Sequence, residues 1–217
     1  MVPARRLSPN LRRAVIVLCW SVVGAVLLWS RYGLLASGPW EWDESNFARA
    51  LVDFDLAAHF PHPPGFPGWI AIGKLVRWLV PEPLVALQVA SATASLVTVV
   101  LLTLAARRVV PTVVAASAAV LTAFLPGVWL HAERGFASTT ATTFAVAACV
   151  VLLARHTPIR LTGASALAAV AVLVRPQLAP VAALIWFAGA WRARRWRDLV
   201  PGVTVAAAMT AIAATAM

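Results

Sequence analysis

Long runs of apolar residues, separated by short blocks of charged residues, divide this chain of 217 residues. Four of the runs, residues 14–35, 84–106, 113–130 and 136–154, reach or approach the length of about 20 residues that a transmembrane helix needs. Hydrophobic residues make up 61% of the chain and its mean hydropathy is +0.84, so a water-soluble fold could not cover its surface with polar groups. The pattern predicts an all-α fold, a polytopic transmembrane helical bundle.

A further apolar stretch, residues 161–190, lies between two basic blocks and is too short for two ordinary crossings. The blocks contain Arg155 and Arg160 on one side, and Arg192, Arg194, Arg195 and Arg197 on the other. Because short loops rich in Lys and Arg stay in the cytoplasm, both blocks should lie inside. We therefore predict a short hairpin, residues 161–174 and 176–190, that turns at Arg175-Pro176 near the outer surface. A last span is expected at residues 199–217.

The loop charges also predict the orientation. Four arginines precede the first apolar run and Arg107 and Arg108 follow the second, which places the N-terminus in the cytoplasm and the Glu133-Arg134 turn outside. The first run is too long for the core of a signal peptide and has no A-x-A cleavage site, so it should be retained. Lys74 is the only lysine among the 18 basic residues, a usage from which we expect a GC-rich bacterial source. Together with the apolar runs, this predicts a multi-pass protein of the bacterial inner membrane.

Composition adds two expectations. The net charge of +10 would favour nucleic-acid binding in a soluble protein, but here the basic blocks set the topology, so no nucleic-acid partner is expected. The last apolar run ends at Met217 without a polar tail, so we expect the N-terminal part of a longer transmembrane domain, or a truncated product. No second domain is predicted within residues 1–217.

The loop between the first two long runs, residues 37–80, contains most of the eight acidic residues. Its second half, from His59 to Pro67, is rich in proline, which fixes φ and excludes a regular helix. Residues 69–80 follow, with Lys74 and Arg77 at i and i+3, and they are typical of a short interfacial helix. We expect a rigid outer loop with short helices that lie against the membrane surface.

The charged residues of this outer side each allow a structural and a functional interpretation. Asp43 could be the N-cap of a solvated helix whose dipole favours Glu44, or a general base at the membrane surface. His62 could be a histidine held by its prolines and the loop backbone, or part of a site. Arg175 could extend to the lipid headgroups, or it could bind a phosphate, which suits a guanidinium. Glu133 and Arg134 could be a local ion pair in a tight turn.

The order of these motifs resembles the GT-C glycosyltransferases, in the branch of the protein O-mannosyltransferases and the lipid A aminoarabinose transferases. The resemblance rests on Asp43-Glu44 after the first span, His62-Pro63-Pro64 before a short helix, and Arg107-Arg108 after the next span. The Glu133-Arg134-Gly135-Phe136-Ala137-Ser138 turn and Leu173-Val174-Arg175-Pro176 match later landmarks. Two positions depart from the family: Thr139 replaces an Asp found in many relatives, and Arg175-Pro176-Gln177 replaces Lys-Gly-Pro.

The resemblance implies transfer of a sugar from a polyprenyl-phosphate carrier to an acceptor protein, glycan or lipid on the outer face. Asp43 and Glu44 are then the catalytic pair, with Asp43 taking the acceptor proton. The substrate-binding residues are His62, Lys74, Arg134 and Arg175, and the cations among them would hold the departing lipid phosphate. No cofactor is assigned: a divalent metal is compatible with the superfamily, but the loop shows no ligand spacing that defines a site.

Two other classes of function are compatible with the residues. A transporter or flippase would use Arg175 and Glu133 to line a substrate path and the outer loop as a gate. It predicts paired charges at several depths and an inverted repeat, and the sequence shows neither. A non-catalytic fragment would only anchor or assemble with another subunit.

Overall fold

The structure is a computed structural model that describes residues 8–154 and 157–192, together with Arg197, Val200, residues 202–204, residues 207–208 and Ala211. The described residues form helices and no strand, apart from one isolated bridge between Asp55 and Phe60. The helices are α1 (Pro9–Tyr32), α2 (Trp42–Ala50), α3 (Pro67–Val76), α4 (Pro83–Ala106), α5 (Thr112–Ala123), α6 (Pro126–Ala132), α7 (Ala137–Leu152), α8 (Pro158–Val174), the 3₁₀ turn Pro176–Leu178 and α9 (Ala179–Arg192). The span predicted at 199–217 lies largely outside the described residues, as do Arg155, Arg194 and Arg195 of the basic blocks.

Two of these helices are long and apolar enough to cross a membrane: α4, and residues Arg13–Tyr32 of α1. A third candidate arises if α5 and α6 count together as one bent span. These lengths and compositions indicate a membrane protein. They agree with the all-helical fold that the sequence predicts.

The run predicted as one span at 113–130 is broken. Helix α5 ends at Ala123, α6 begins at Pro126, and their axes differ by 71°. Proline has no N–H for the helix ladder and disfavours helical backbone in the residue before it, so Leu125 adopts an extended conformation with ψ 134°. The hydrophobic pattern continues across this break and therefore did not reveal it.

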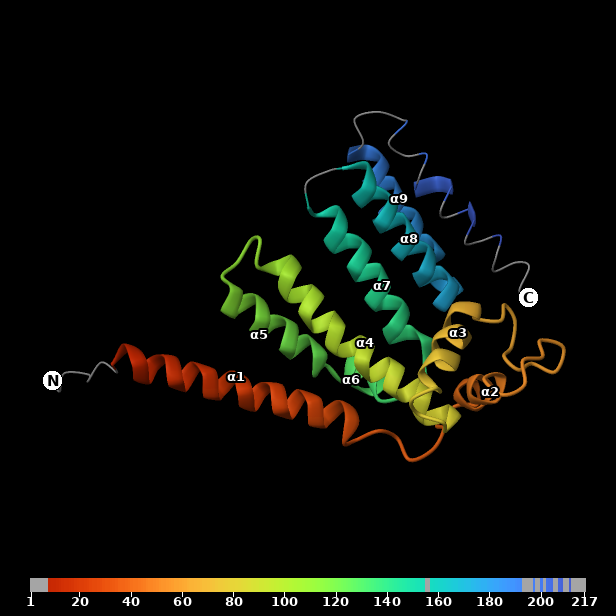
Figure 1. Ribbon diagram of the computed structural model, residues 1–217, viewed down its shortest axis with the longest axis horizontal. Coiled ribbons are helices and arrows are strands. Elements are labelled where there is room, and N and C mark those ends of the chain that lie inside the picture. The colour runs from red at the N-terminus through yellow and green to blue at the C-terminus, as the bar shows by residue number, and fades with distance from the viewer. Residues whose placement is uncertain are drawn as a thin grey trace.

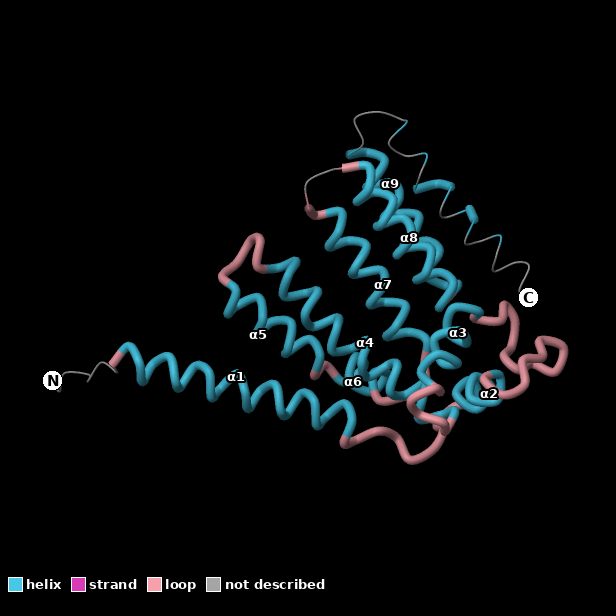
Figure 2. Tube along the Cα trace, viewed as in Figure 1, coloured by secondary structure: helices cyan, strands magenta, loops and turns pink. Residues whose placement is uncertain are grey.

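The helices lie side by side, and the loops gather at one end of them (Figures 1 and 2). Helices α7, α8 and α9 run next to one another, and the chain reverses at Arg175-Pro176 between α8 and α9. We call the end of the helices formed by α2, α3, the turn Glu133–Phe136 and Arg175 the loop end. Arg107 and Arg108, between α4 and α5, lie at the opposite end.

The packing differs between the loop end and the helices behind it. At the loop end, large side chains from α2, α3, α4 and α8 form a core that includes Phe47, Trp69, Leu87 and Val174. Behind it, α7, α8 and α9 meet through a cluster composed mainly of alanines. Small residues let helix backbones approach closely, which is how helices associate where burial of apolar surface provides no driving force. Helix α1 extends away from this packing and is mostly exposed (Figure 1).

Helix α3 approaches the end of α8 so closely that only a glycine fits between them. A Cβ at Gly68 would lie 2.8 Å from the carbonyl carbon of Leu173 and 2.8 Å from the backbone nitrogen of Val174. Backbone atoms cannot rotate aside as a side chain can. The contact therefore sets where α3 lies relative to the Arg175-Pro176 turn.

We expect Gly68→Ala to destabilise the protein by about 1–3 kcal/mol, because the added methyl group forces α3 and α8 apart. Gly127→Ala is the matched control, since Gly127 also follows the first proline of a helix but has no neighbour within 4 Å of an added Cβ. The measurement is the thermal unfolding midpoint of each purified variant in detergent. Equal midpoints for the two variants would contradict the close approach of α3 to α8.

Candidate functional site at the loop end

Helix α2 begins one residue before Asp43, and its cap is not Asp43. Glu41 is the N-cap residue, with extended backbone at φ −128° and ψ 157°, and Asp43 and Glu44 follow within the first turn. The interpretation of Asp43 as the N-cap is therefore wrong. Glu44 accepts from the N–H groups of Trp40 and of the N-cap residue Glu41, and the carboxylate of Asp43 takes no part in this cap.

Glu44 is completely buried and ties the outer loop to a distant turn. One oxygen of its carboxylate, Oε2, accepts hydrogen bonds from the backbone N–H of Trp40 at 2.7 Å and of Glu41 at 3.3 Å. The other oxygen, Oε1, accepts a hydrogen bond from the N–H of Gly135 at 2.9 Å. Hydrogen bonds to an ionised group are the strongest class in proteins, and they are what makes a buried carboxylate tolerable. Glu44 thus forms a structural link between the outer loop and the turn before α7.

The same turn brings a guanidinium against the start of the outer loop. Arg134 is buried, and its Cζ lies 3.6 Å from the centroid of the Trp40 ring, the geometry of a cation–π contact. Glu133 and Arg134 make no salt-bridge contact within 4 Å, although the charge of Arg134 still acts on the Glu133 carboxyl. Burial raises the pKa of the Glu133 carboxyl, and the charges of Arg31 and Arg134 partly oppose that rise.

Asp43 faces His62, which an aromatic pocket holds in place. Asp43 Oδ1 lies 3.7 Å from His62 Nδ1, close enough for charge attraction and too long for a hydrogen bond. The imidazole stacks on Trp42 with centroids 6.4 Å apart and contacts the rings of Phe47 at 5.9 Å and Phe66 at 5.1 Å. The Asp43 side chain is 43% exposed and that of His62 24% exposed. The pair is therefore positioned by its surroundings and open on the carboxylate side.

Arg175 reaches the beginning of α7. Its Nη1 donates a hydrogen bond to Ser138 Oγ, in the first turn of that helix. Arg134 lies in the turn that leads into the same helix, but its guanidinium packs on Trp40 of the outer loop, and no described contact joins it to Arg175. Lys74 is exposed on α3, with its Nζ 5.9 Å from the centroid of the Phe54 ring, and its described contact does not connect it to that helix start.

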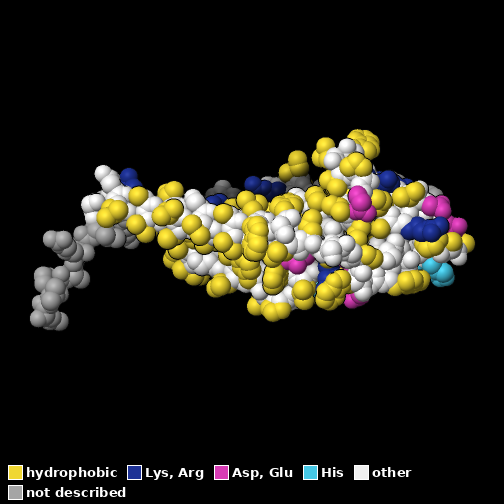
Figure 3. Space-filling view, turned by 90° about the horizontal axis from the view of Figure 1, so that it is seen from below, with side chains coloured by type: hydrophobic (Ala, Val, Ile, Leu, Met, Phe, Trp, Pro, Cys, Tyr) yellow, Lys and Arg dark blue, Asp and Glu magenta, His cyan; other side chains and the backbone are white. Residues whose placement is uncertain are grey.

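The predicted residues thus fall into two groups, and both groups are attached to the turn Glu133–Phe136 or to the helix that follows it. Asp43 and His62 form one, Arg134 and Arg175 the other, and Trp40 and Glu44, which flank Asp43, both contact the turn that carries Arg134. In the space-filling view, the histidines and most of the acidic side chains on view lie toward the end where α2 is found, whereas the surface over α1 is largely hydrophobic (Figure 3). The polar chemistry of this surface is concentrated at the loop end.

The sequence did not indicate Arg31, which is completely buried at the end of α1. Its Nε donates to Ser95 Oγ at 3.0 Å, its Nη1 donates to Ser30 Oγ at 3.1 Å, and its Nη2 donates to the carbonyl oxygen of Ala123. An arginine in a membrane-spanning segment is costly unless it is paired or hydrogen-bonded. In the sequence, Arg31 lies beside Tyr32 near the end of an apolar run and resembles an ordinary charge at the end of a membrane span. Only its isolation from other charged residues could have indicated that it is buried and hydrogen-bonded.

Within the described residues, no group of three or more His, Cys, Asp and Glu side chains is arranged to hold a metal ion. Asp43 and His62 therefore stand as a pair. Comparison with known proteins adds no identification, because no protein-family model, no curated protein and no solved structure matches this chain. The loop end has to be interpreted from its own geometry.

The geometry of Glu44 predicts that even a conservative change there destabilises the protein. In Glu44→Gln one carboxylate oxygen becomes an NH₂ group, which cannot accept from the N–H groups that both oxygens now serve. At least one buried N–H loses its partner, at a cost of about 1–3 kcal/mol. The measurement is the thermal midpoint in detergent, with Asp53→Asn as an exposed acid-to-amide control in the same loop. A midpoint for Glu44→Gln equal to that of the control would show that Glu44 does not hold the loop.

Proposed function

We propose that this chain is part of a polytopic membrane glycosyltransferase that moves a sugar from a polyprenyl-phosphate carrier to an acceptor. The observation that carries the proposal is the Glu44 link. It holds an accessible carboxylate, Asp43, on the same support as a guanidinium, Arg134, and Arg175 reaches the helix that follows this turn. A carboxylate that accepts a proton and cations that receive a phosphate are the two requirements of this reaction.

Asp43 is the proposed general base. Its carboxylate is nearly half exposed, which allows an acceptor hydroxyl or amine to approach it, and it is not engaged in capping α2. His62 lies 3.7 Å away and is restrained by three aromatic rings, so it can orient Asp43 and share the proton that the acceptor releases. Glu44, by contrast, holds the loop, and we assign it a positioning role.

The start of α7 is the proposed place for the carrier phosphate. Arg175 brings a positive charge to it through Ser138, Arg134 lies in the turn that leads into it, and the N–H groups of a helix start add the positive end of the helix dipole. As the glycosidic bond breaks, negative charge grows on the phosphate, and fixed cations stabilise that charge without reorganising. Lys74, exposed on α3, is a further cation that a bound carrier could recruit.

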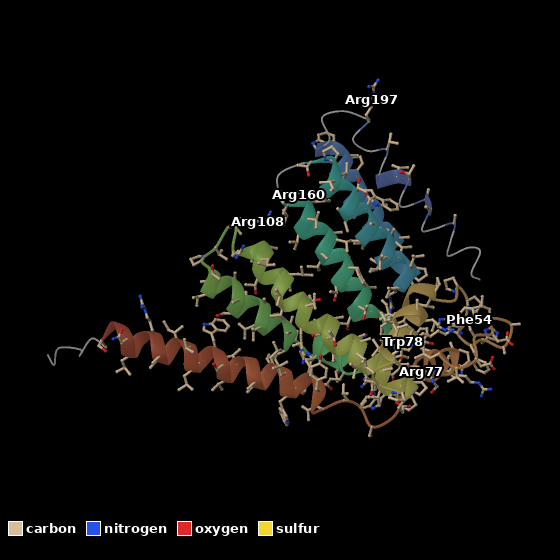
Figure 4. All side chains as sticks on the ribbon, viewed as in Figure 1. Phe54, Arg77, Trp78, Arg108, Arg160 and Arg197 are labelled. Carbon is tan, nitrogen blue, oxygen red and sulfur yellow. The ribbon has the colours of Figure 1, made fainter. Side chains whose placement is uncertain are left out.

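We further propose a multi-pass topology in the inner membrane, with the loop end on the outer face. Figure 4 supports one feature of this arrangement: Arg108 and Arg160 lie at the opposite end of the helices from Phe54, Arg77 and Trp78. Basic residues concentrate on the cytoplasmic side of membrane proteins, so the end that carries Arg108 and Arg160 is assigned to the cytoplasm. Acceptor and carrier would then meet on the outer face.

Labelling of single cysteines tests this orientation. We expect Gln177→Cys, exposed at the Arg175-Pro176 turn, to react with a membrane-impermeant maleimide on intact cells, in a background with Cys19 and Cys149 replaced by alanine. Val109→Cys, 85% exposed at the opposite end, should react only after permeabilisation. The reverse pattern would place the loop end in the cytoplasm.

The decisive test of the chemistry is Asp43→Asn, which keeps the shape of the side chain and removes its proton affinity. If Asp43 is the base, turnover should fall by about 10² to 10⁴ with little change in carrier binding. The measurement is release of polyprenyl phosphate in membranes that contain the full-length gene product and radiolabelled polyprenyl-phosphate hexoses and pentoses. Near-normal turnover by Asp43→Asn would remove the proposed base.

Two further variants provide a control for Asp43→Asn and separate loss of turnover from loss of carrier binding. Asp55→Asn is the matched control, because Asp55 is an exposed acid of the same loop that caps the N–H groups of Ala57 and Ala58, a role that asparagine can also take. Arg175→Ala should weaken carrier binding by roughly tenfold, the effect of losing a charged hydrogen bond. Loss of turnover in Asp43→Asn and loss of affinity in Arg175→Ala are distinct outcomes and separate the two roles.

A further inference from the structure

The end of α1 holds both sides of the break between α5 and α6. On one side, Nη2 of the buried Arg31 donates to the carbonyl oxygen of Ala123, the last residue of α5, where a helix leaves its carbonyl groups without partners of its own. On the other side, the indole N–H of Trp129 in α6 donates to the carbonyl oxygen of Ser30 at 3.4 Å. These two contacts fix the direction in which α6 leads to the turn Glu133–Phe136.

Glu133, the first residue of that turn, interacts with the charge of Arg31. Its Oε1 is buried and accepts no hydrogen bond from the described residues. Burial raises the pKa of the Glu133 carboxyl, and Arg31 opposes that rise more strongly than Arg134 does, although Arg134 is the next residue in the chain. The indole N–H of Trp129 also favours the ionised carboxylate. The ionised form of Glu133 therefore depends chiefly on the charge of Arg31.

Arg134 makes its own contact elsewhere. Its guanidinium packs on the ring of Trp40 at 3.6 Å, and no salt bridge within 4 Å joins it to Glu133. Arg31 and Glu133 have no such contact either, so their attraction acts through space, where a protein interior weakens it less than water does. Two cations and one carboxylate leave one positive charge over. Because Arg31 attracts Glu133 more strongly, that charge lies mainly on Arg134.

We infer that Arg31 is a positioning residue of the carrier-phosphate site, which balances the charge of Glu133 so that Arg134 keeps its positive charge for an anion. The inference rests on the proposed function, because the anion is the phosphate of the polyprenyl carrier. Arg31 acts through Glu133 and not by contact, since its own hydrogen bonds go to Ser30, Ser95 and Ala123. Without Arg31, the carboxylate of Glu133 would have Arg134 as its remaining cation, and the carrier phosphate would compete with it.

A purely structural role of Arg31 has a different consequence. If Arg31 only held α1 against α4 and α5, its loss would weaken the protein in the same way whether or not Glu133 carried a charge. If Arg31 balances Glu133, its effect on carrier affinity depends on that charge. A double-mutant cycle on the two residues separates these roles.

The measurement is the affinity of the full-length protein, in nanodiscs, for radiolabelled polyprenyl phosphate. We expect Arg31→Gln to weaken binding about tenfold, the effect of losing one charged interaction. The double variant, Arg31→Gln with Glu133→Gln, should bind within about twofold of the unmutated protein. Arg31→Lys keeps the charge without the planar fork and should retain most of the affinity. Arg13→Gln, at an exposed position near the other end of α1, is the matched control and should bind as the unmutated protein does.

The outcomes distinguish this inference from the proposed function. Unchanged affinity in Arg31→Gln, or no recovery in the double variant, would overturn the inference and leave the proposed function in place. No binding of polyprenyl phosphate by the unmutated protein would overturn both. If Arg31→Gln does not fold, Glu133→Gln alone decides: the carrier should bind more tightly than to the unmutated protein, because less of the charge of Arg134 is compensated, and equal or weaker binding would overturn the inference.

Discussion

The carboxylate of Glu44 is the interaction on which the loop end depends. A buried negative charge is costly, and here three backbone N–H groups compensate it: two from the outer loop and one from the turn before α7. Because both carboxylate oxygens are used, the two segments keep one relative position. The stacking of Arg134 on Trp40 and the approach of Asp43 to His62 both begin from that position.

Helix α4 connects several segments through polar side chains. Gln88 Nε2 donates to the carbonyl oxygen of Ala36, Ser91 Oγ donates to that of Phe136, and Ser95 Oγ accepts from Arg31. Thr98 pairs with Thr143 of α7. These four polar contacts, placed along one face at helical spacing, connect α4 to α1, to the outer loop and to α7. In an apolar surrounding such contacts provide orientation that burial of apolar surface alone does not.

Several features of the site could be predicted from single residues, and others could not. The prolines between His59 and Pro67 prevent a helix there, and the loop runs without one. The family resemblance groups Asp43 and Glu44 as a pair, with Asp43 as the base. The structure gives the two side chains different partners: Glu44 accepts from the N–H of Gly135, and Asp43 lies beside His62. The cap at Glu41 depends on backbone angles that the residue pattern does not specify, whereas the break before Pro126 follows from the proline itself, which the hydrophobic pattern ignores.

By itself, the sequence determined helices, apolar lengths that could cross a membrane, and a polar loop in which four of the six candidate residues lie, namely Asp43, Glu44, His62 and Lys74. These follow from the length of a span and from the conformational limits of proline. Only the tertiary structure decided which charges are buried and what they contact. Gly135, a partner of Glu44, lies 91 residues away in the sequence; Ser95, a partner of Arg31, lies 64 residues away; and Ser138, the partner of Arg175, lies 37 residues away. Such contacts form because a desolvated polar group must find a partner wherever packing places one.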